Sequence, residues 1–187
     1  MNAMLEKRGM TPLGSIAEYR SVFCFPIAQY YRNVGFDFAS EPFEDLAQEF
    51  IGLYHADKSG NSSLFSGAEA VLSTIYKQNI TQIVLSTSQQ CNLTLQMSEF
   101  DIGHYFDEVL GLGDIYAKSK IDLGVGYMER NGTKNTLLIG DTTHDYEVAK
   151  TLGVDCILVA NGHQNRETLL SCNVDVLDDI SCTINYI

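Results

Sequence analysis

Two aspartates that follow an apolar run carry the clearest chemical signal in this sequence. Residues 137–139 lead into Gly140, and the chain continues Gly-Asp-Thr-Thr-His-Asp, which places Asp141 and Asp145 four residues apart. In parallel sheets, binding residues gather where the carboxyl end of a strand turns into a helix. Carboxylate oxygens, water and phosphate oxygens are the ligands that Mg²⁺ prefers. Asp141 is therefore a candidate magnesium ligand, and a solvated turn residue is the plainer alternative.

Asp145 has a structural and a chemical interpretation. Thr142 and Asp145 have the spacing of a capping box, in which each side chain bonds the backbone of the other residue at a helix start. Acidic side chains also favour the first helical turn. We expect Asp145 to steady the loop while bonding to metal-bound water. His144 lies between the two aspartates and is expected to be a loop contact, because imidazole prefers softer metals than magnesium.

Ser86 ends another apolar run, Ile83–Leu85. A hydroxyl and the backbone N–H groups that follow it make a natural phosphate cradle where a helix starts. Thr87 adds a further donor next to it. An ordinary helix cap is the plainer alternative for Ser86 taken alone.

Two lysines follow at a loop-to-helix junction, Lys118 and Lys120. Either ammonium group could neutralise a phosphate or a charge that develops in a transition state. A solvated basic pair is the common alternative, and the local spacing leaves open which of the two lysines would act.

The elements that must position these residues divide the chain into two parts. Residues 1 to about 65 have helical spacing throughout, and Ser15 with Glu18 fits a capping box. The polar stretch 57–63 is the best candidate linker. After it, helix and strand patterns alternate, which predicts a parallel sheet. We expect helices over 68–78, 92–100, 119–130, 142–152 and 167–172, and strands over 82–86, 108–111, 136–140, 154–159 and 174–177.

The predicted fold class is therefore α/β, with a Rossmann-like, doubly wound parallel sheet and an N-terminal helical cap. The expected domains are the cap, residues 1–65, and the core, residues 66–187.

Charge and composition exclude several classes of partner. The 187 residues carry a formal net charge of -12, which argues against nucleic acids and anionic membranes as partners. No apolar run approaches the roughly 20 residues of a membrane span, and no signal peptide opens the chain. The 5 cysteines include no Cys-x-x-Cys pair. Reduced thiols in a cytoplasmic protein are the simplest interpretation.

Taken in order, these features resemble the haloacid dehalogenase-like hydrolase superfamily, in particular its phosphoglycolate-phosphatase-like branch with a helical cap. Residues 140–150 are similar to the family's fourth motif, and Val84-Leu-Ser86 is similar to its second. Lys118 matches the lysine of the third motif, with Lys120 as the alternative. The resemblance implies that Asp141 binds magnesium with support from Asp145. It also implies that the substrate is a small phosphorylated metabolite.

One piece of the family pattern is missing from the sequence. The family's first motif is an apolar strand ending in Asp-x-Asp-Gly-Thr, whose first carboxylate is the nucleophile and whose second is the general acid and base. These 187 residues contain no such motif. In the family that strand is central in the sheet, between the strands that end at Ser86 and at Asp141. We expect another segment or a partner chain, including a second copy in a homo-oligomer, to fill its place, or the flanking strands to close up.

The missing motif leaves two hypotheses about function. The first is a magnesium-dependent phosphatase that lacks its nucleophile strand, with negligible turnover and weak or absent metal binding in the chain as written. The second is a non-catalytic, phosphate-binding or oligomeric member of the same fold. A receiver-like or nucleotide-binding domain is disfavoured, because an all-helical part precedes the first strand. Tyr19, Arg20, Phe25 and Tyr30 could reach the site from the cap, and helix packing is the simpler role for the aromatic residues.

Overall fold

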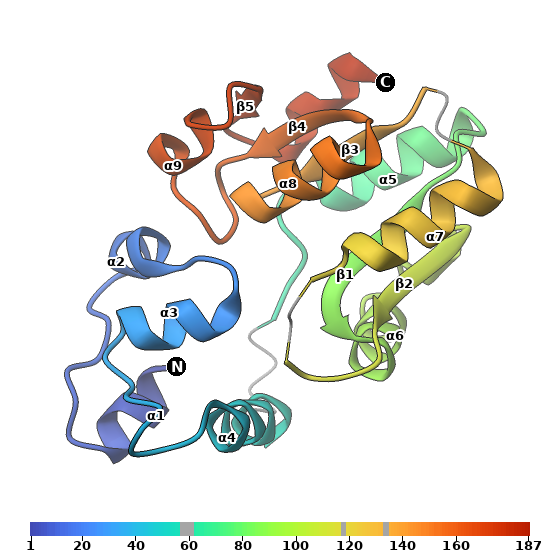
Figure 1. Ribbon diagram of the computed structural model, residues 1–187. Helices are drawn as coiled ribbons and strands as arrows, with labels where there is room; N and C mark the ends of the chain where they lie inside the picture. The colour runs from blue at the N-terminus through green and yellow to red at the C-terminus, as the bar shows by residue number, and fades with distance from the viewer. Residues whose placement is uncertain (57–61, 117–118, 133–134) are drawn as a thin grey trace.

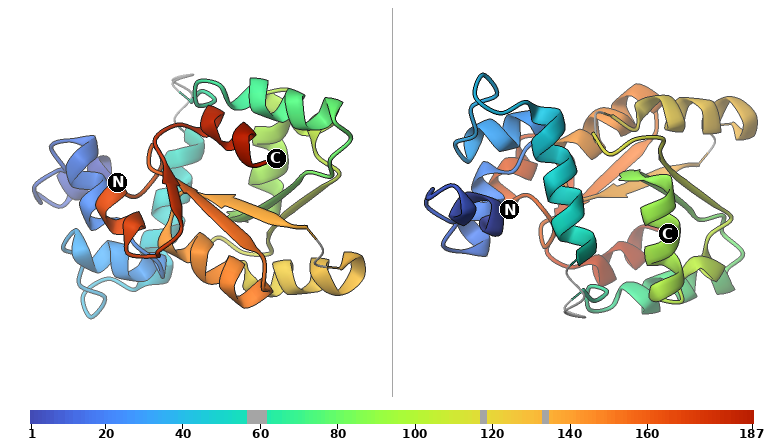
Figure 2. Two further views of the ribbon diagram at one scale, coloured as in Figure 1. Left: turned by 90° about the horizontal axis from the view of Figure 1, so that it is seen from above. Right: turned by 90° about the horizontal axis from the view of Figure 1, so that it is seen from below.

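A small helical part lies beside an α/β part in the computed structural model, which describes residues 1–56, 62–116, 119–132 and 135–187 (Figures 1 and 2). The helical part contains α1 (Asn2–Lys7), α2 (Ile16–Val22), α3 (Ile27–Asn33) and α4 (Phe43–Ala56). The α/β part contains α5 (Ala68–Lys77), β1 (Ile83–Gln89), α6 (Gln90–Glu99), η1 (Gly103–Tyr105), β2 (Glu108–Leu112), α7 (Ile121–Asn131), β3 (Leu137–Gly140), α8 (Thr143–Leu152), β4 (Asp155–Val159), α9 (Arg166–Leu170), β5 (Asp175–Leu177) and η2 (Ile180–Tyr186). The predicted fold class, α/β with an N-terminal helical part, is confirmed. None of the described helices is long and apolar enough to cross a membrane.

The helical part has a hydrophobic core of its own. Met4 and Leu5 of α1 are completely buried, and Leu46 of α4 is 1% exposed. The Arg8 guanidinium joins the end of α1 to α4. Its Nη2 lies 2.6 Å from the carboxylate of Glu49 in α4, and its Nε lies 2.7 Å from that of Glu41, just before α4. A separate core of Leu158, Leu169, Cys172 and Val176 lies in the α/β part. From these two cores we propose that the chain divides into two domains. The predicted linker lies partly in residues 57–61, outside the described part of the chain.

The predicted capping box at Ser15 is half right. The Ser15 hydroxyl accepts a hydrogen bond from the Glu18 N–H at 3.1 Å, as expected of an N-cap. The Glu18 carboxylate, however, accepts from the Gly14 N–H at 2.6 Å and not from Ser15. The reciprocal bond therefore moves one residue upstream, because the free N–H of Gly14 is within reach of the carboxylate.

The first strand is longer than the pattern predicts, and the next helix starts earlier. β1 continues through Gln89, and α6 begins at Gln90, where the prediction ended the strand at Ser86 and opened the helix at Asn92. The Gln90 side chain accepts from the Gly111 N–H at 2.6 Å and donates to the Val109 carbonyl at 3.1 Å. These two hydrogen bonds to β2 fix the start of α6 at Gln90. Hydrophobic periodicity could not predict them, because they join residues far apart in the chain.

The strands that the structure describes form two separate parallel sheets. β1 pairs with β2, and β3 pairs with β4, which pairs with β5 on its other side. Within the described residues, β1 and β3 exchange no ladder hydrogen bonds, so the strands that flank the expected central position have not closed up. Among the described strands, β1 pairs only with β2 and β3 only with β4, so each has one edge without a strand partner.

Helices hold the two sheets together. α6 packs on β1 and β2, and α8 packs on β3 and β4. α7 contacts both β2 and α8, and Gly124 of α7 lies so close to Leu85 of β1 and Leu152 of α8 that a Cβ there would come within 3.2 Å and 2.9 Å of them. α5, which precedes β1, packs against η2, which follows β5. Helix contacts therefore replace strand pairing between the two sheets.

Because the two parts have separate hydrophobic cores, a cavity made in one core should destabilise that part alone. We expect Leu46→Ala and Leu158→Ala each to lower the free energy of unfolding of its own domain by about 2–5 kcal/mol, the usual cost of a large-to-small core substitution. Native-state hydrogen exchange measured by mass spectrometry is the readout. Leu46→Ala should reduce protection in α1–α4, and Leu158→Ala should reduce it in β3–β5. Equal loss of protection in both parts from either variant would contradict the division into domains.

Candidate active site

Asp145 is the most heavily bonded acidic side chain at the end of β3. Its Oδ2 accepts from the Asp141 N–H at 3.0 Å, the Thr142 N–H at 2.9 Å and the Thr142 hydroxyl at 2.6 Å. Its Oδ1 lies 2.6 Å from Nζ of Lys120. The predicted capping box of Thr142 and Asp145 is present at the start of α8. Both carboxylate oxygens are thus occupied by protein donors, and Asp145 organises the loop.

Opposing effects act on the protonation of Asp145, which is only 4% exposed. Burial by itself would raise the pKa of this carboxyl group, but the charge of Lys120 and the donors of Thr142 and Asp141 outweigh it and hold the pKa below its ordinary value. Asp145 therefore stays ionised, and its buried charge depends on Lys120.

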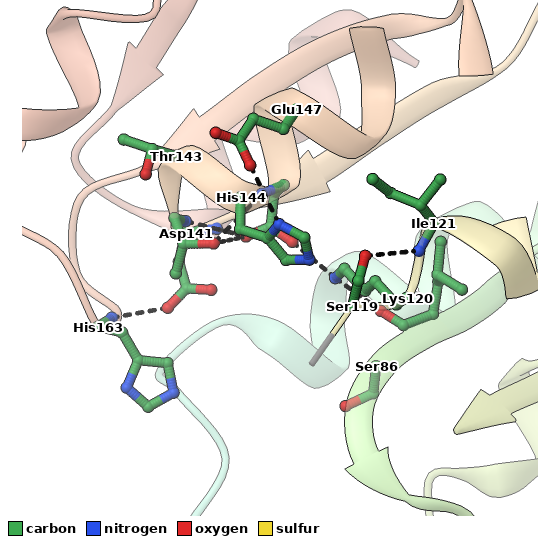
Figure 3. Close-up of polar contacts among 12 residues, drawn as sticks. Ser86, Ser119, Lys120, Ile121, Asp141, Thr143, His144, Glu147 and His163 are labelled. Carbon is green, nitrogen blue, oxygen red and sulfur yellow. Dashed lines mark hydrogen bonds and ion pairs between the residues drawn. The ribbon is translucent and has the colours of Figure 1, made fainter. Parts of the chain in front are cut away.

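Lys120 connects the two sheets through one ammonium group. Nζ donates to the Leu85 carbonyl of β1 at 2.8 Å and contacts Asp145 at the start of α8 (Figure 3). Both side chains of the ion pair are largely buried. Of the two candidate lysines, Lys120 reaches the acidic loop, while Lys118 lies outside the described residues.

Asp141 is held from the opposite side by the loop that follows β4. Its Oδ2 accepts from the His163 N–H at 2.6 Å. Gly162 lies so close that an added Cβ would collide with the Asp141 carboxylate, and Gly140 has the same relation to Asp145. The two glycines let the backbone approach the two carboxylates closely.

A magnesium ion would find one carboxylate ligand here. Within the described residues, Oδ1 of Asp141 accepts no hydrogen bond, whereas both oxygens of Asp145 are engaged. The described part of the chain contains no group of three or more His, Cys, Asp or Glu residues that could enclose a metal. Magnesium usually takes one or two carboxylates and fills its other positions with water and phosphate oxygens. The donor set therefore fits part of a magnesium site, with Asp141 as its ligand.

Ser86 and Thr87 lie on the same cavity as Asp141 and Lys120. This cavity has a volume of about 850 Å³, and residues of both the helical part and the α/β part line it. The Ser86 hydroxyl accepts from the Ser88 N–H at 3.1 Å, which leaves its own hydrogen to donate. In Figure 3, Ser86 of β1, Lys120 before α7 and Asp141 after β3 surround one open space. The structure brings the described candidate residues together.

The loop after β4 is the part of the site that sequence reasoning missed. Arg20 of α2 donates to the carbonyl oxygens of Gly162 and Asn161, at 2.8 and 2.6 Å. The Tyr19 hydroxyl lies 2.5 Å from Nδ1 of His163. Gln164 is 2% exposed, accepts from the Thr143 N–H at 2.7 Å and donates to the Phe23 carbonyl at 3.2 Å. These bonds join the helical part to the loop that holds Asp141, and no motif or spacing marks them.

The bonds of Lys120 predict a large effect of its removal. Lys120→Met should lower the free energy of unfolding by about 3–5 kcal/mol, because it leaves the Asp145 charge buried without its partner. Lys77→Met, at the exposed end of α5, is the matched control and should change stability little. In urea denaturation, the added change Asp145→Asn should recover part of the loss. An unaltered midpoint for Lys120→Met would contradict this role.

The lowered pKa of Asp145 predicts a loss of stability in acid. A carboxyl group with a folded-state pKa below its unfolded value stabilises the fold at pH above that unfolded value, and the contribution is lost as pH falls through the folded pKa. Urea unfolding should therefore show stability decreasing below about pH 4 in the wild type. In Asp145→Asn this decrease should be shallower. Identical slopes for the two proteins would refute the assignment.

Comparisons with known proteins identify a family with a similar sequence. Residues 1–159 match the family model of haloacid dehalogenase-like hydrolases. A phosphoglycolate phosphatase of Pseudomonas fluorescens is 22% identical over 125 residues, which cover 65% of this chain and 46% of the relative. The chain spans about half the length of the curated relatives it matches.

Solved structures share the fold. A predicted phosphatase from Clostridium acetobutylicum superposes with a TM-score of 0.79 at 18% identity, covering 100% of this chain and 88% of that one. A predicted phosphoglycolate phosphatase from Haemophilus somnus gives a TM-score of 0.78 at 16% identity, covering 99% and 87%. Because the family model matches most of the sequence and these folds agree with it, the chain belongs to the haloacid dehalogenase-like hydrolases.

Proposed function

We propose that this chain carries the phosphate-binding and metal-binding residues of a magnesium-dependent phosphatase of small phosphorylated metabolites. The observation that carries the proposal is the meeting of Ser86, Lys120 and Asp141, from three separate segments, on one cavity of about 850 Å³. A hydroxyl, a cation and a carboxylate with a free oxygen are the groups that a metal-bound phosphate ester requires. The phosphoglycolate phosphatases among its relatives support the same class of substrate.

Each residue has a role that its contacts allow. Ser86 donates its hydroxyl hydrogen to a phosphate oxygen, and Thr87 adds a second donor beside it. The Lys120 ammonium has three hydrogens, of which two point to Leu85 and Asp145 and the third remains for phosphate. Lys118 stays the alternative for this role. Asp141 holds magnesium, which when bound supplies charge stabilisation of the phosphate oxygens, and Asp145 supports the site by keeping Lys120 and the loop in place.

The nucleophile would come from a strand between β1 and β3. The resemblance implies two carboxylates at the end of such a strand. One attacks phosphorus and forms an aspartyl-phosphate as the ester bond breaks, and the other protonates the departing alcohol and then activates water. Among the described strands, β1 and β3 each have an edge without a strand partner, and these free edges support the assignment. A further segment of a longer protein or a partner chain could supply the strand.

The same free edges favour one alternative, a binding protein without catalysis. A second copy of the chain could pair with an edge of β1 or β3, as exposed edges commonly do. In that case the cavity would bind phosphate without hydrolysing it.

We expect the 187-residue chain to bind inorganic phosphate in the presence of MgCl₂ and to hydrolyse p-nitrophenyl phosphate negligibly. Loss of a nucleophile typically costs several orders of magnitude in rate, on the order of 10⁴ or more. Calorimetric titration should show weaker phosphate binding in Ser86→Ala and unchanged binding in Ser98→Ala, an exposed serine of α6. Robust hydrolysis that disappears in Asp141→Asn would refute the missing-nucleophile proposal.

A chain extended at its N-terminus by an apolar strand ending in Asp-x-Asp-Gly-Thr separates the two functions. Turnover restored by this extension, and abolished when its first Asp becomes Asn, supports the phosphatase. A stable dimer of the 187-residue chain in light scattering, together with an extension that restores nothing, supports the binding protein instead.

A further inference from the structure

Two buried polar atoms in the described part of the chain have no hydrogen-bond partner, the Tyr30 hydroxyl and Nε2 of His144. Tyr30 is 4% exposed and His144 is 6% exposed. An unsatisfied buried polar group is destabilising, so native structures contain few of them. Both residues line the cavity that holds Ser86, Lys120 and Asp141. The coincidence points to a ligand that supplies the missing bonds.

Tyr30 and His144 stand at the ends of a continuous run of aromatic rings. The ring centroids of Tyr30 and Phe23 are 5.2 Å apart, those of Phe23 and Phe25 5.7 Å, and those of Phe25 and His144 4.8 Å. Tyr30 belongs to α3 of the helical part, and His144 belongs to α8, next to the acidic loop (Figure 3). The run therefore forms one wall from the helical part to the acidic loop, with a polar atom at each end.

The two polar atoms complement each other. Burial raises the pKa of Tyr30 to about 12, which keeps its phenol protonated and able to donate. Nδ1 of His144 lies 3.3 Å from Oε2 of Glu147, and a carboxylate there favours the tautomer with the proton on Nδ1. In that tautomer Nε2 carries a lone pair and accepts. A donor and an acceptor together suit hydroxyl groups, which can fill both roles.

Charge argues for an uncharged organic group at this wall. Among the described residues that line the cavity, Lys120 is the one lysine or arginine, and it is paired with Asp145. The carboxylates of Asp141 and Asp145 lie on the same cavity. A second anionic group, beyond the phosphate, would therefore find no uncommitted lysine or arginine among the described residues that line the cavity. Hydroxyl groups carry no such cost.

We propose that Tyr30 and His144 form a subsite for a hydroxyl-bearing, uncharged organic part of the substrate. The substrate class is then a phosphorylated polyol or sugar, as distinct from a phosphorylated carboxylic acid. The inference rests on the phosphatase site proposed above, whose Ser86 and Lys120 hold the phosphate.

Calorimetric titration of the 187-residue chain in MgCl₂ tests this subsite with four probes, namely inorganic phosphate, propyl phosphate, glycerol 3-phosphate and 2-phosphoglycolate. Glycerol 3-phosphate should bind more tightly than propyl phosphate and 2-phosphoglycolate. Tyr30→Phe should weaken glycerol 3-phosphate binding about 5- to 10-fold, the worth of one hydrogen bond, and leave the other affinities unchanged. His144→Phe keeps a ring against Phe25 and should act in the same way.

Tyr146→Phe is the control, since Tyr146 of α8 does not line this cavity, and it should leave all affinities unchanged. Tyr30→Phe removes only an unpartnered hydroxyl and should fold normally, which retained phosphate binding will verify. The subsite proposal is overturned if Tyr30→Phe weakens all three esters equally or none of them, or if 2-phosphoglycolate binds most tightly. Inorganic phosphate that fails to bind the wild type would instead overturn the phosphatase site itself.

Discussion

The contact between Lys120 and Asp145 is the constraint on which the site depends. One ammonium group bonds β1 through the Leu85 carbonyl and the start of α8 through Asp145, and so joins two sheets whose described strands share no ladder. The Asp145 carboxylate in turn accepts hydrogen bonds from the backbone N–H groups of Asp141 and Thr142. A buried charge of this kind is tolerated only while its partner and donors are in place. This ion pair therefore helps to fix the positions of Ser86, Lys120 and Asp141 relative to one another.

A second set of bonds joins the helical part to this centre. Arg20 and Tyr19 of α2 bond the loop after β4, whose His163 N–H holds Asp141. Gln164 bonds both the start of α8 and the Phe23 carbonyl. A movement of the helical part would consequently be felt at the Asp141 carboxylate. This coupling gives the helical part a role in placing the site as well as in covering it.

Membership in the haloacid dehalogenase-like hydrolases accounts for the order of elements, and the described strands of this chain form two separate sheets. Helix contacts through α7 and α8, and through α5 and η2, hold the sheets where strand pairing does not. Ser86, Lys120 and Asp141 lie on one cavity although β1 and β3 belong to separate sheets. The bonds of Lys120 to Leu85 and Asp145 join the two sheets there. The bonds that position the site therefore differ from the strand pairing that builds the fold. The family resemblance by itself does not identify those bonds.

The sequence by itself determined the local features. Apolar runs ending at Ser86 and Gly140, the capping box of Thr142 and Asp145 and the helical spacing of the first part are all set by residues close in the chain, so periodicity and cap chemistry predict them. The family motifs added the candidate roles of Ser86, of Lys118 with Lys120 as its alternative, and of Asp141. Tertiary structure alone decided that Lys120 reaches Asp145, that His163 and Gln164 belong to the site, and that Tyr30 and His144 are left unpartnered. Those features join residues that are far apart in the chain. A local sequence pattern cannot predict such contacts, because they depend on how the helices and strands pack in three dimensions.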